Sequence, residues 1–533
     1  MLRLRELFIR NFRSIREHRF NLPPLTILVG RNDVGKSNIL DAITYLLEGT
    51  GKNITVKEFF DPAQPIEIVG VFQGAQNYLD RCDQRNRTRI QERINDDDEI
   101  TIRRIAQAPS ELTKIEIRSP ASGEFDIPTG IDAALRRLLP EVIKIEALAD
   151  VSEETKNTQK DALGKLMRQV LSAIEDRIQP QVEDAFAQVN TALNVQRVQV
   201  EGGIQYQDNR VQELRAVETR ITGYLRETFP AAGIRLDVGL PTVKEILGKI
   251  DLLVVEGNQE DPYYRRGHGL QRVLYLSLLR ALADRIRESE ESPIKRPFIL
   301  LFEEPEAFLH PEAQIKMRNA LSAISGEAQV ILATHSPIIV TADAIDNTVR
   351  VEKVQEAGIA KPFTRGWGPV NPDELQAPER QMLQLFALQR SSKFLFANGV
   401  LLVEGVGDEH LIAAIAKRLA DIDFEALDIC LVECGGKAKI VHFMRVVQRM
   451  GLKTWAIVDL DYLWDGAGEL IGTEVQYAQF GQELNRLVPR ENRGALTDAE
   501  RREVKRLRKE ACIGPLSAQR DALCILLAQR HAV

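Results

Sequence analysis

Residues 30 to 37, GRNDVGKS, carry the spacing of a phosphate-binding loop. The apolar run LTILV precedes the loop and a helix-like apolar pattern follows it, which is the setting that such a loop requires. Gly30 and Gly35 allow successive N–H groups to face a phosphate, and the helix adds the positive end of its dipole. In this arrangement Lys36 reaches the β- and γ-phosphates and Ser37 binds Mg²⁺. A glycine turn between strand and helix is the alternative, but it does not explain the full spacing.

Two later apolar runs end in groups suited to hydrolysis. FILLF is followed by Glu303 and Glu304, and QVILA is followed by Thr334 and His335. Paired carboxylates at the end of a buried strand suit Mg²⁺ binding and activation of the attacking water. We expect His335 to act beside the γ-phosphate, with a purely structural histidine as the alternative.

A second set of acids follows apolar runs in the C-terminal part of the chain. Glu404 ends LLVE, Asp408 opens the next helix, and Asp459 and Asp461 follow TWAIV. Because α/β sites gather at the carboxyl ends of parallel strands, we expect these acids to lie together. Crowded acids repel one another unless cations lie among them, and oxygen ligands of this kind select Mg²⁺ or Mn²⁺. Solvated loop carboxylates are the alternative.

The elements that must position these groups divide the chain into two α/β parts with a helical insertion in the first. Strand-like alternation gives way to apolar residues at three- and four-residue spacing, and strands then return. The predicted parts are 1–151, the insertion 152–235, 236–390 and 391–533. The apolar stripes of the insertion indicate either a helical core alone or a core that also forms a dimer interface. In the third part, GHGLQR places Gly267 and Gly269 at a helix start, where backbone N–H groups are presented.

Composition limits the partners and the compartment. The net charge is −7 over 533 residues, so a nucleic-acid partner requires a local basic patch. The segment RREVKRLRKEA near the C-terminus supplies either such a patch or an ordinary solvated helix. Five cysteines without a CxxC pair argue against a disulfide framework and favour a cytoplasmic location. Neither secretion nor membrane spanning is indicated.

With these motifs in view, the chain resembles an ABC-type ATPase of the SMC/RecF branch followed by a Toprim domain. The matching segments are NFRS, GRNDVGKS as Walker A, GHGLQR at the place of the ABC signature, LLFEEPE as Walker B, EAFLHP as the D-loop, ATHSP as the H-loop, and 400–465 as Toprim. An ATPase with a helical insertion and a C-terminal Toprim is the order found in the overcoming-lysogenization-defect (OLD) family of nucleases. That family includes phage-defence effectors similar to the nuclease subunit of Gabija systems.

The resemblance implies an α/β fold, namely an ABC-type ATPase with a helical insertion followed by a Rossmann-like Toprim domain. It implies that Glu303 binds Mg²⁺, Glu304 polarises the lytic water and His335 senses the γ-phosphate. The nucleotide contacts that it implies are Arg13, Asn32, Gly35, Lys36, Ser37, Gly267 and Gly269. In the Toprim part it implies that Glu404, Asp408, Asp459 and Asp461 bind the two metal ions of a phosphodiester-cutting centre.

The expected function is an ATP-hydrolysing, Mg²⁺- or Mn²⁺-dependent DNA endonuclease of anti-phage defence under nucleotide control. We expect DNA and a further copy of the chain, as a homodimer or higher homo-oligomer, to be partners, with room for a second defence-system protein and none for a membrane. The alternative is an ATP-switched DNA-binding scaffold that recruits a separate effector and has an inactive or incomplete Toprim. Toprim domains of the family generally continue past the end of this chain with further acids and a lysine, for which we identify no counterparts here.

Overall fold

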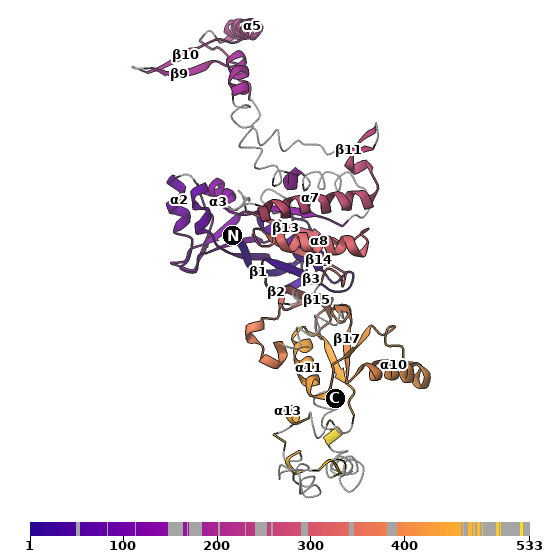
Figure 1. The fold of residues 1–533 in the computed structure, drawn as a ribbon. Coiled ribbons are helices and arrows are strands. Elements are labelled where there is room, and N and C mark those ends of the chain that lie inside the picture. The colour runs from indigo at the N-terminus through magenta and orange to yellow at the C-terminus, as the bar shows by residue number, and fades with distance from the viewer. Residues whose placement is uncertain are drawn as a thin grey trace. The chain divides into compact units, whose positions relative to one another are not determined.

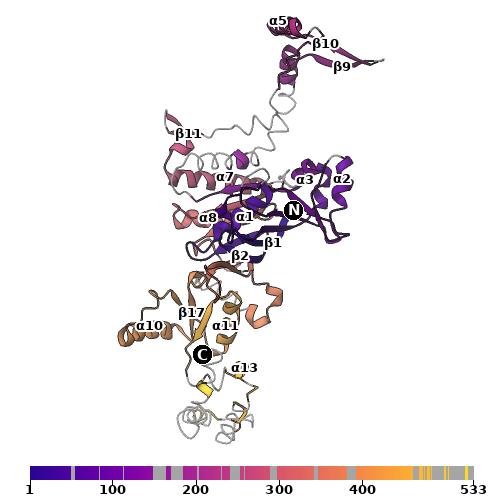
Figure 2. The same ribbon diagram turned by 180° about the vertical axis from the view of Figure 1, so that it is seen from behind.

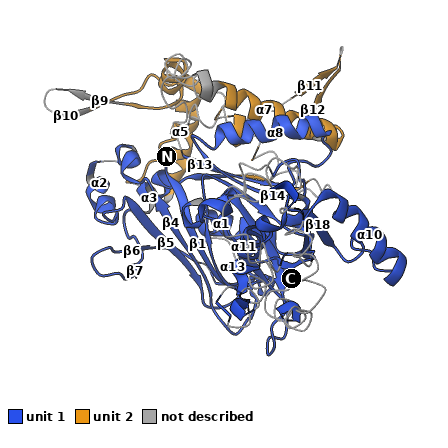
Figure 3. Cartoon of the chain, turned by 60° about the horizontal axis from the view of Figure 1, so that its bottom comes forward, with its two compact units in different colours: residues 1–142, 297–533 blue, residues 143–296 orange. Residues whose placement is uncertain are grey.

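The computed structural model describes most of the chain (Figures 1 and 2). The described residues are 1–49, 54–147, 184–239, 253–288, 297–340, 346–380 and 392–459, with gaps at 83, 112, 201–202, 230 and 257–258, plus isolated positions in 162–169 and after 459. Residues 1–142 with 297–533 form one compact unit, and residues 143–296 form another (Figure 3). No helix in the described part combines the length and apolar character that a bilayer-spanning segment needs.

The larger unit contains an antiparallel sheet with the strand order β2-β1-β4-β5-β6-β7. Its strands are β1 (Arg3–Phe12), β2 (Ile15–Asn21), β4 (Ile66–Gln73), β5 (Glu99–Ala106), β6 (Ile115–Arg118) and β7 (Phe125–Asp126). Burial alternates residue by residue along β4 and β5, because successive side chains of a strand point to opposite faces. These strands account for the strand-like alternation that precedes the predicted insertion.

A second sheet of six strands carries the phosphate-binding loop and has the order β16-β15-β3-β14-β13-β8. Its strands are β3 (Leu25–Val29), β8 (Glu141–Ile145), β13 (Phe298–Glu303), β14 (Gln329–Thr334), β15 (Thr348–Val354) and β16 (Phe363–Trp367). The neighbours from β13 through β14 and β3 to β15 run parallel. β13 and β14 are buried almost throughout, which explains their uninterrupted apolar sequences.

Helix α1 (Lys36–Glu48) contacts β1 and β4 of the antiparallel sheet and β14 of the other, and Figure 2 shows it beside β1. Its inward face consists of Ile39, Leu40, Ala42, Ile43 and Leu46, all fully buried. The buried guanidinium of Arg104 from β5 donates to the carbonyl oxygen of Leu46, from Nη2 at 3.0 Å and from Nε at 3.2 Å. This cation satisfies a carbonyl at the C-terminal end of the helix, where the helix dipole favours positive charge.

The side chain of Gln329 links the two sheets. Gln329, the fully buried first residue of β14, accepts a hydrogen bond from the N–H of Leu4 and donates one to the carbonyl of Leu4, both at 2.8 Å. The amide therefore pairs with β1 in the way that another strand would. Because a buried amide without these partners would cost free energy, this contact fixes the two sheets against each other.

The C-terminal part of the larger unit is built on a parallel sheet with the order β18-β17-β19. Its elements are β17 (Gly399–Val403), α10 (Val406–Ala420), β18 (Ile429–Glu433), α11 (Ile440–Arg449) and β19 (Lys453–Ala456). Helix α11 buries one apolar face and contacts β17 and β19, whereas α10 contacts β17 and β18 with no buried residue. All three strands end at the same edge, as the sequence predicts for strands followed by acids.

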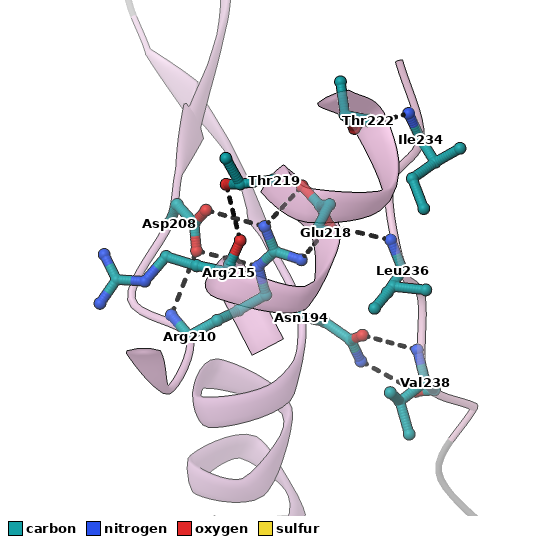
Figure 4. Close-up of polar contacts among 10 residues, drawn as sticks. All are labelled: Asn194, Asp208, Arg210, Arg215, Glu218, Thr219, Thr222, Ile234, Leu236 and Val238. Carbon is teal, nitrogen blue, oxygen red and sulfur yellow. Dashed lines mark hydrogen bonds and ion pairs between the residues drawn. The ribbon is translucent and has the colours of Figure 1, made fainter. Parts of the chain in front are cut away.

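The smaller unit contains the hairpin of β9 (Gln196–Val200) and β10 (Gly203–Gln207), α5 (Gln212–Thr228), the hairpin of β11 (Leu253–Glu256) and β12 (Gln259–Pro262), and α7 (His268–Glu288). At one end, Arg210 is almost fully buried and forms ion pairs with Asp208 and Glu218 (Figure 4). Glu218 also accepts the N–H of Leu236, and the Asn194 amide pairs with both backbone groups of Val238. These contacts hold the extended segment after α5 in place.

Several predicted features fall outside the described residues. Asp461 is among them, as are most of residues 152–183 and most of the basic segment 501–511. The helix predicted at GHGLQR is confirmed, because α7 begins at His268.

Candidate active sites

The phosphate-binding loop lies between β3 and α1 and packs closely against β15 and β16. Gly30 and Gly35 have φ angles of +148° and +102°, which side-chain-bearing residues rarely adopt. A Cβ at Gly30 would come within 2.2 Å of the Val351 carbonyl oxygen, and one at Gly35 within 2.2 Å of Thr364 Oγ1. Both glycines are therefore required by the conformation of the loop and by the strands behind it.

The side chain of Lys36 lies within this loop. Its Nζ donates to the carbonyl oxygens of Gly30 at 3.0 Å and Arg31 at 2.8 Å, and lies 2.9 Å from Nε2 of His335. Burial lowers the pKa of Lys36 to about 8, although the charges of Glu304, Glu306 and Glu303 act in the opposite direction. The ammonium is thus held by neutral acceptors. The negatively charged oxygens of a phosphate would be stronger acceptors and could take their place.

His335 follows β14 and faces Lys36. Burial and the nearby Lys36 charge lower the pKa of His335, so the imidazole is neutral at pH 7 and its Nε2 can accept a hydrogen bond from Lys36 Nζ. The structure therefore brings together the lysine of the loop and the histidine that the sequence placed at the end of another strand.

Glu306 positions this strand end, and the sequence reasoning missed it. Its Oε1 accepts the N–H of His335 at 2.7 Å, and its Oε2 accepts the hydroxyl of Thr334 at 2.8 Å. Burial raises the pKa of Glu306, while these two hydrogen bonds oppose the rise. The only sequence signal was a third acid, separated by one proline from Glu303 and Glu304.

Glu303 and Glu304 lie at the C-terminal end of β13, next to the end of β14. The N–H of Glu304 donates to the carbonyl oxygen of Ala333 at 2.8 Å, and Glu304 has a φ angle of +44°. Both carboxylates are near enough to Lys36 to favour its charged form. The two acids, Lys36 and His335 therefore share the carboxyl edge of the parallel sheet.

The other predicted nucleotide contacts are more dispersed. Arg13 forms ion pairs with Asp41 of α1 and with Glu58, so its guanidinium contacts protein carboxylates here. Asn32 and Ser37 are exposed at the loop. The predicted contacts Gly267 and Gly269 belong to the smaller unit, at the start of α7, and no described atom beyond their chain neighbours and the backbone of their own helix lies within 4 Å of where their Cβ atoms would be.

A second candidate site lies at the carboxyl edge of the β18-β17-β19 sheet. Oε1 of Glu404 accepts the N–H of Asp459 at 3.0 Å, and the carbonyl oxygen of Glu404 accepts the N–H of Gly436 at 2.8 Å. Glu404 therefore joins the segments that follow all three strands. Gly435 and Gly436 have φ angles of +67° and +121°, and this turn brings the chain back over the end of β17.

Asp408 lies in the first turn of α10, and its Oδ2 accepts the N–H of Gly405 at 3.0 Å. It therefore caps the helix that starts beside Glu404. No group of three or more His, Cys, Asp or Glu residues suited to a metal ion is found among the described residues, a set that lacks Asp461. The oxygen donors that are present, Glu404, Asp408 and Asp459, are of the type that Mg²⁺ and Mn²⁺ prefer.

The comparisons with known proteins agree with a division of the chain into an ATPase part and a C-terminal Toprim part. Residues 2–149 and 76–340 match the family described as AAA ATPase domain, and residues 395–461 match that described as overcoming lysogenization defect protein-like, TOPRIM domain. The chain is thus an ATPase that carries a Toprim nuclease domain. It is 30% identical over 474 residues to the Old nuclease of Escherichia phage P2, which covers 87% of this chain and 78% of that protein. The chain belongs to the OLD nuclease family.

Two further relatives have similar coverage. The OLD nuclease of Thermus scotoductus is 23% identical over 475 residues, or 86% of this chain and 82% of that protein. Endonuclease GajA of Bacillus cereus is 23% identical over 473 residues, or 85% of this chain and 74% of that protein. The family, the α/β fold class and the enzyme class expected from the motifs are confirmed.

Proposed function

We propose that this OLD-family enzyme is a metal-dependent DNA endonuclease under nucleotide control that acts in anti-phage defence. The observation that carries the nuclease part is the contact between the Glu404 carboxylate and the Asp459 backbone at the carboxyl edge of β17. That edge is where α/β folds place their sites. The relative named Endonuclease GajA supports the defence role.

In the proposed reaction, Glu404, Asp408, Asp459 and Asp461 hold Mg²⁺ or Mn²⁺. Such ions, when bound, activate water for attack on a phosphodiester and stabilise the leaving oxygen. The protein orients its acids through backbone contacts: Asp459 N–H fixes the Glu404 carboxylate, and Gly405 N–H fixes that of Asp408. Fixed ligands need little reorganisation when the substrate arrives.

The nucleotide site is proposed at the edge shared by β3, β13 and β14. Lys36 neutralises the phosphates, Ser37 and Glu303 bind Mg²⁺, and Glu304 orients the attacking water. His335, fixed by Glu306, contacts the γ-phosphate. Arg13, Asn32, Gly267 and Gly269 are the remaining proposed contacts, the two glycines acting on the nucleotide of a facing copy.

A homodimer or higher homo-oligomer formed through the insertion is part of the proposal, although this predicted helical segment also contains the β9–β10 hairpin. The apolar stripe of α5, made of Val217, Ile221 and Tyr224, is 48%, 41% and 66% exposed. Residues at this spacing share one face of a helix, and an exposed apolar face favours a partner surface. We accordingly propose that residues 152–235 form the dimerising insertion. The ATPase segments on either side of it are 1–151 and 236–390, and the Toprim domain is 391–533.

Plasmid nicking tests the proposal. Purified protein with supercoiled plasmid and Mg²⁺ or Mn²⁺ should produce open circles. Asp459→Ala should reduce the rate at least about a hundredfold, because loss of even an outer-shell partner of a metal ligand costs about ten- to a hundredfold. Asp421→Asn is the matched control, since Asp421 is an exposed acid of the same domain at the end of α10. Cleavage that survives Asp459→Ala would refute the assigned centre, and no cleavage by the wild type would favour the scaffold.

A further inference from the structure

Arg31 of the phosphate-binding loop contacts the Toprim domain. Nη1 of Arg31 lies 3.1 Å from Oδ2 of Asp428 and 3.4 Å from Oδ1 of Asn398. Arg31 directly follows Gly30 in the loop, whereas Asn398 and Asp428 directly precede β17 and β18. All these residues belong to the larger unit. One guanidinium therefore joins the loop to the starts of two Toprim strands.

The two Toprim residues are also bound to each other. Asn398 N–H donates to the carbonyl oxygen of Asp428 at 2.8 Å, and Asn398 Nδ2 donates to Oδ2 of Asp428 at 3.4 Å. Each strand extends five residues from this point. β17 ends next to Glu404, and β18 ends at Glu433. Because a strand is extended and hydrogen-bonded to its neighbours, displacement of its start is carried to its end.

Nucleotide binding acts on the backbone of the same arginine. The carbonyl oxygen of Arg31 accepts the Lys36 ammonium at 2.8 Å, next to the Gly30 carbonyl. A lysine that turns to phosphate oxygens would leave both carbonyls, which would remove a hydrogen bond that holds the backbone of Arg31. Arg31 thus contacts Lys36 through its backbone carbonyl and the two Toprim strands through its guanidinium.

A second contact between the same two domains is better buried and serves as the fixed point. Nη1 of Arg350 in β15 donates to the carbonyl oxygen of Gly451 at 3.2 Å, and Arg350 is only 6% exposed. Gly451 packs against the Trp367 ring so closely that a Cβ would lie 2.3 Å from it. The Arg31 and Asp428 side chains, in contrast, are 56% and 42% exposed. The exposed contact can change while the buried one holds.

From these contacts we propose that Arg31, with Asp428 and Asn398, is a positioning group that transmits the nucleotide state of the loop to the metal-binding edge of Toprim. The inference rests on the proposed nucleotide control and names the residues that carry it. Since coupling between two sites is reciprocal, the contact must also alter nucleotide affinity. An exposed ion pair limits that change to about fivefold.

Hydrogen–deuterium exchange with AMP-PNP and Mg²⁺ tests this coupling in the full chain. In the wild type, the nucleotide should change the exchange of β17 and β18 amides. Arg31→Ala and Asp428→Asn should lose that change while still binding AMP-PNP, and Arg31→Lys, which keeps the charge, should retain it. Arg16→Ala is the matched control, because Arg16 is 54% exposed and pairs with Glu356 within the ATPase.

Three results would overturn the coupling: no nucleotide effect on these strands in the wild type, an undiminished effect in Arg31→Ala, or an equal loss in Arg16→Ala. Plasmid cleavage with and without AMP-PNP gives the second measurement, in which Arg31→Ala should lose the nucleotide dependence of the rate. A wild type that never cuts would refute the proposed nuclease, while the exchange experiment would still decide whether Arg31 couples the domains.

Discussion

Nζ of Lys36 lies 2.9 Å from Nε2 of His335, so two residues 299 positions apart in sequence share one proton-bearing contact in the phosphate-binding loop. The contact exists because β3 and β14 are parallel neighbours, and the residues that follow both strands emerge at one edge. Lys36 is therefore buried among neutral partners, and its pKa is lowered until an anion replaces them.

Nucleotide affinity should consequently depend on pH. The pKa of Lys36 is about 8 in the free protein, and phosphate oxygens raise it, so binding takes up a proton. Affinity is then greatest below pH 8 and falls about tenfold between pH 7 and 9, where the charged fraction drops from about nine-tenths to one-tenth. Calorimetry at pH 8 in buffers of different ionisation enthalpy should count about half a proton taken up per ATP. No uptake would mean that Lys36 keeps its proton in the free loop.

Loss of Glu306 should impair hydrolysis although Glu306 is not expected to touch the nucleotide. Glu306→Ala removes both acceptors that fix Thr334 and His335, and hydrogen bonds to a charged group contribute about 1.5–3 kcal/mol. We expect ATP turnover to fall at least about tenfold with little change in KM. Glu306→Gln keeps one acceptor and should be intermediate. Glu312→Ala, an exposed acid in the first turn of helix α8 (Pro311–Ile324), is the control, and equal losses in both alanine variants would contradict this role.

Removal of Arg104 should destabilise the ATPase core. Arg104→Leu deletes the donors to the Leu46 and Thr113 carbonyls, and unsatisfied buried acceptors cost about 1–3 kcal/mol each. The free energy of unfolding should drop by about 2–4 kcal/mol in urea. Arg103→Leu is the control on the same strand, because Arg103 pairs with Glu116 nearer the surface and should cost about 1 kcal/mol or less. Comparable losses in the two variants would show that Arg104 has no special role.

Gly451 should not tolerate a side chain. Gly451→Ala introduces a Cβ at a φ angle of +73° and 2.3 Å from the Trp367 ring. Gly358 has a φ angle of +84° with no neighbour within 4 Å, so Gly358→Ala measures the backbone penalty alone, about 1 kcal/mol. Thermal unfolding should show a clearly larger loss for Gly451→Ala. If the two variants melt together, the junction between β16 and the turn after α11 is looser than the packing indicates.

Local spacing was enough to predict the loop residues and the strand-end acids, because parallel strands bring their carboxyl ends together. Glu404 and Asp459 illustrate this, since two apolar runs over fifty residues apart predicted neighbours that the structure joins by a hydrogen bond. Glu306 and Arg31 could not be predicted in the same way. Their roles depend on particular partners, such as His335 for Glu306 and Asp428 for Arg31, that sequence patterns do not identify. The sequence likewise did not predict that Arg104 is buried, because an arginine in an alternating strand is normally assigned to the exposed face.

The pairing of Gln329 with Leu4 makes the position of β14 depend on the first strand of the chain. Strand β14, which His335 follows, is hydrogen-bonded through its first residue to Leu4 of β1, and Leu2 and Leu4 are fully buried there. Deletion of residues 1–5 would remove these partners of Gln329, so β14 would lose these hydrogen bonds at the end opposite the proposed γ-phosphate contact.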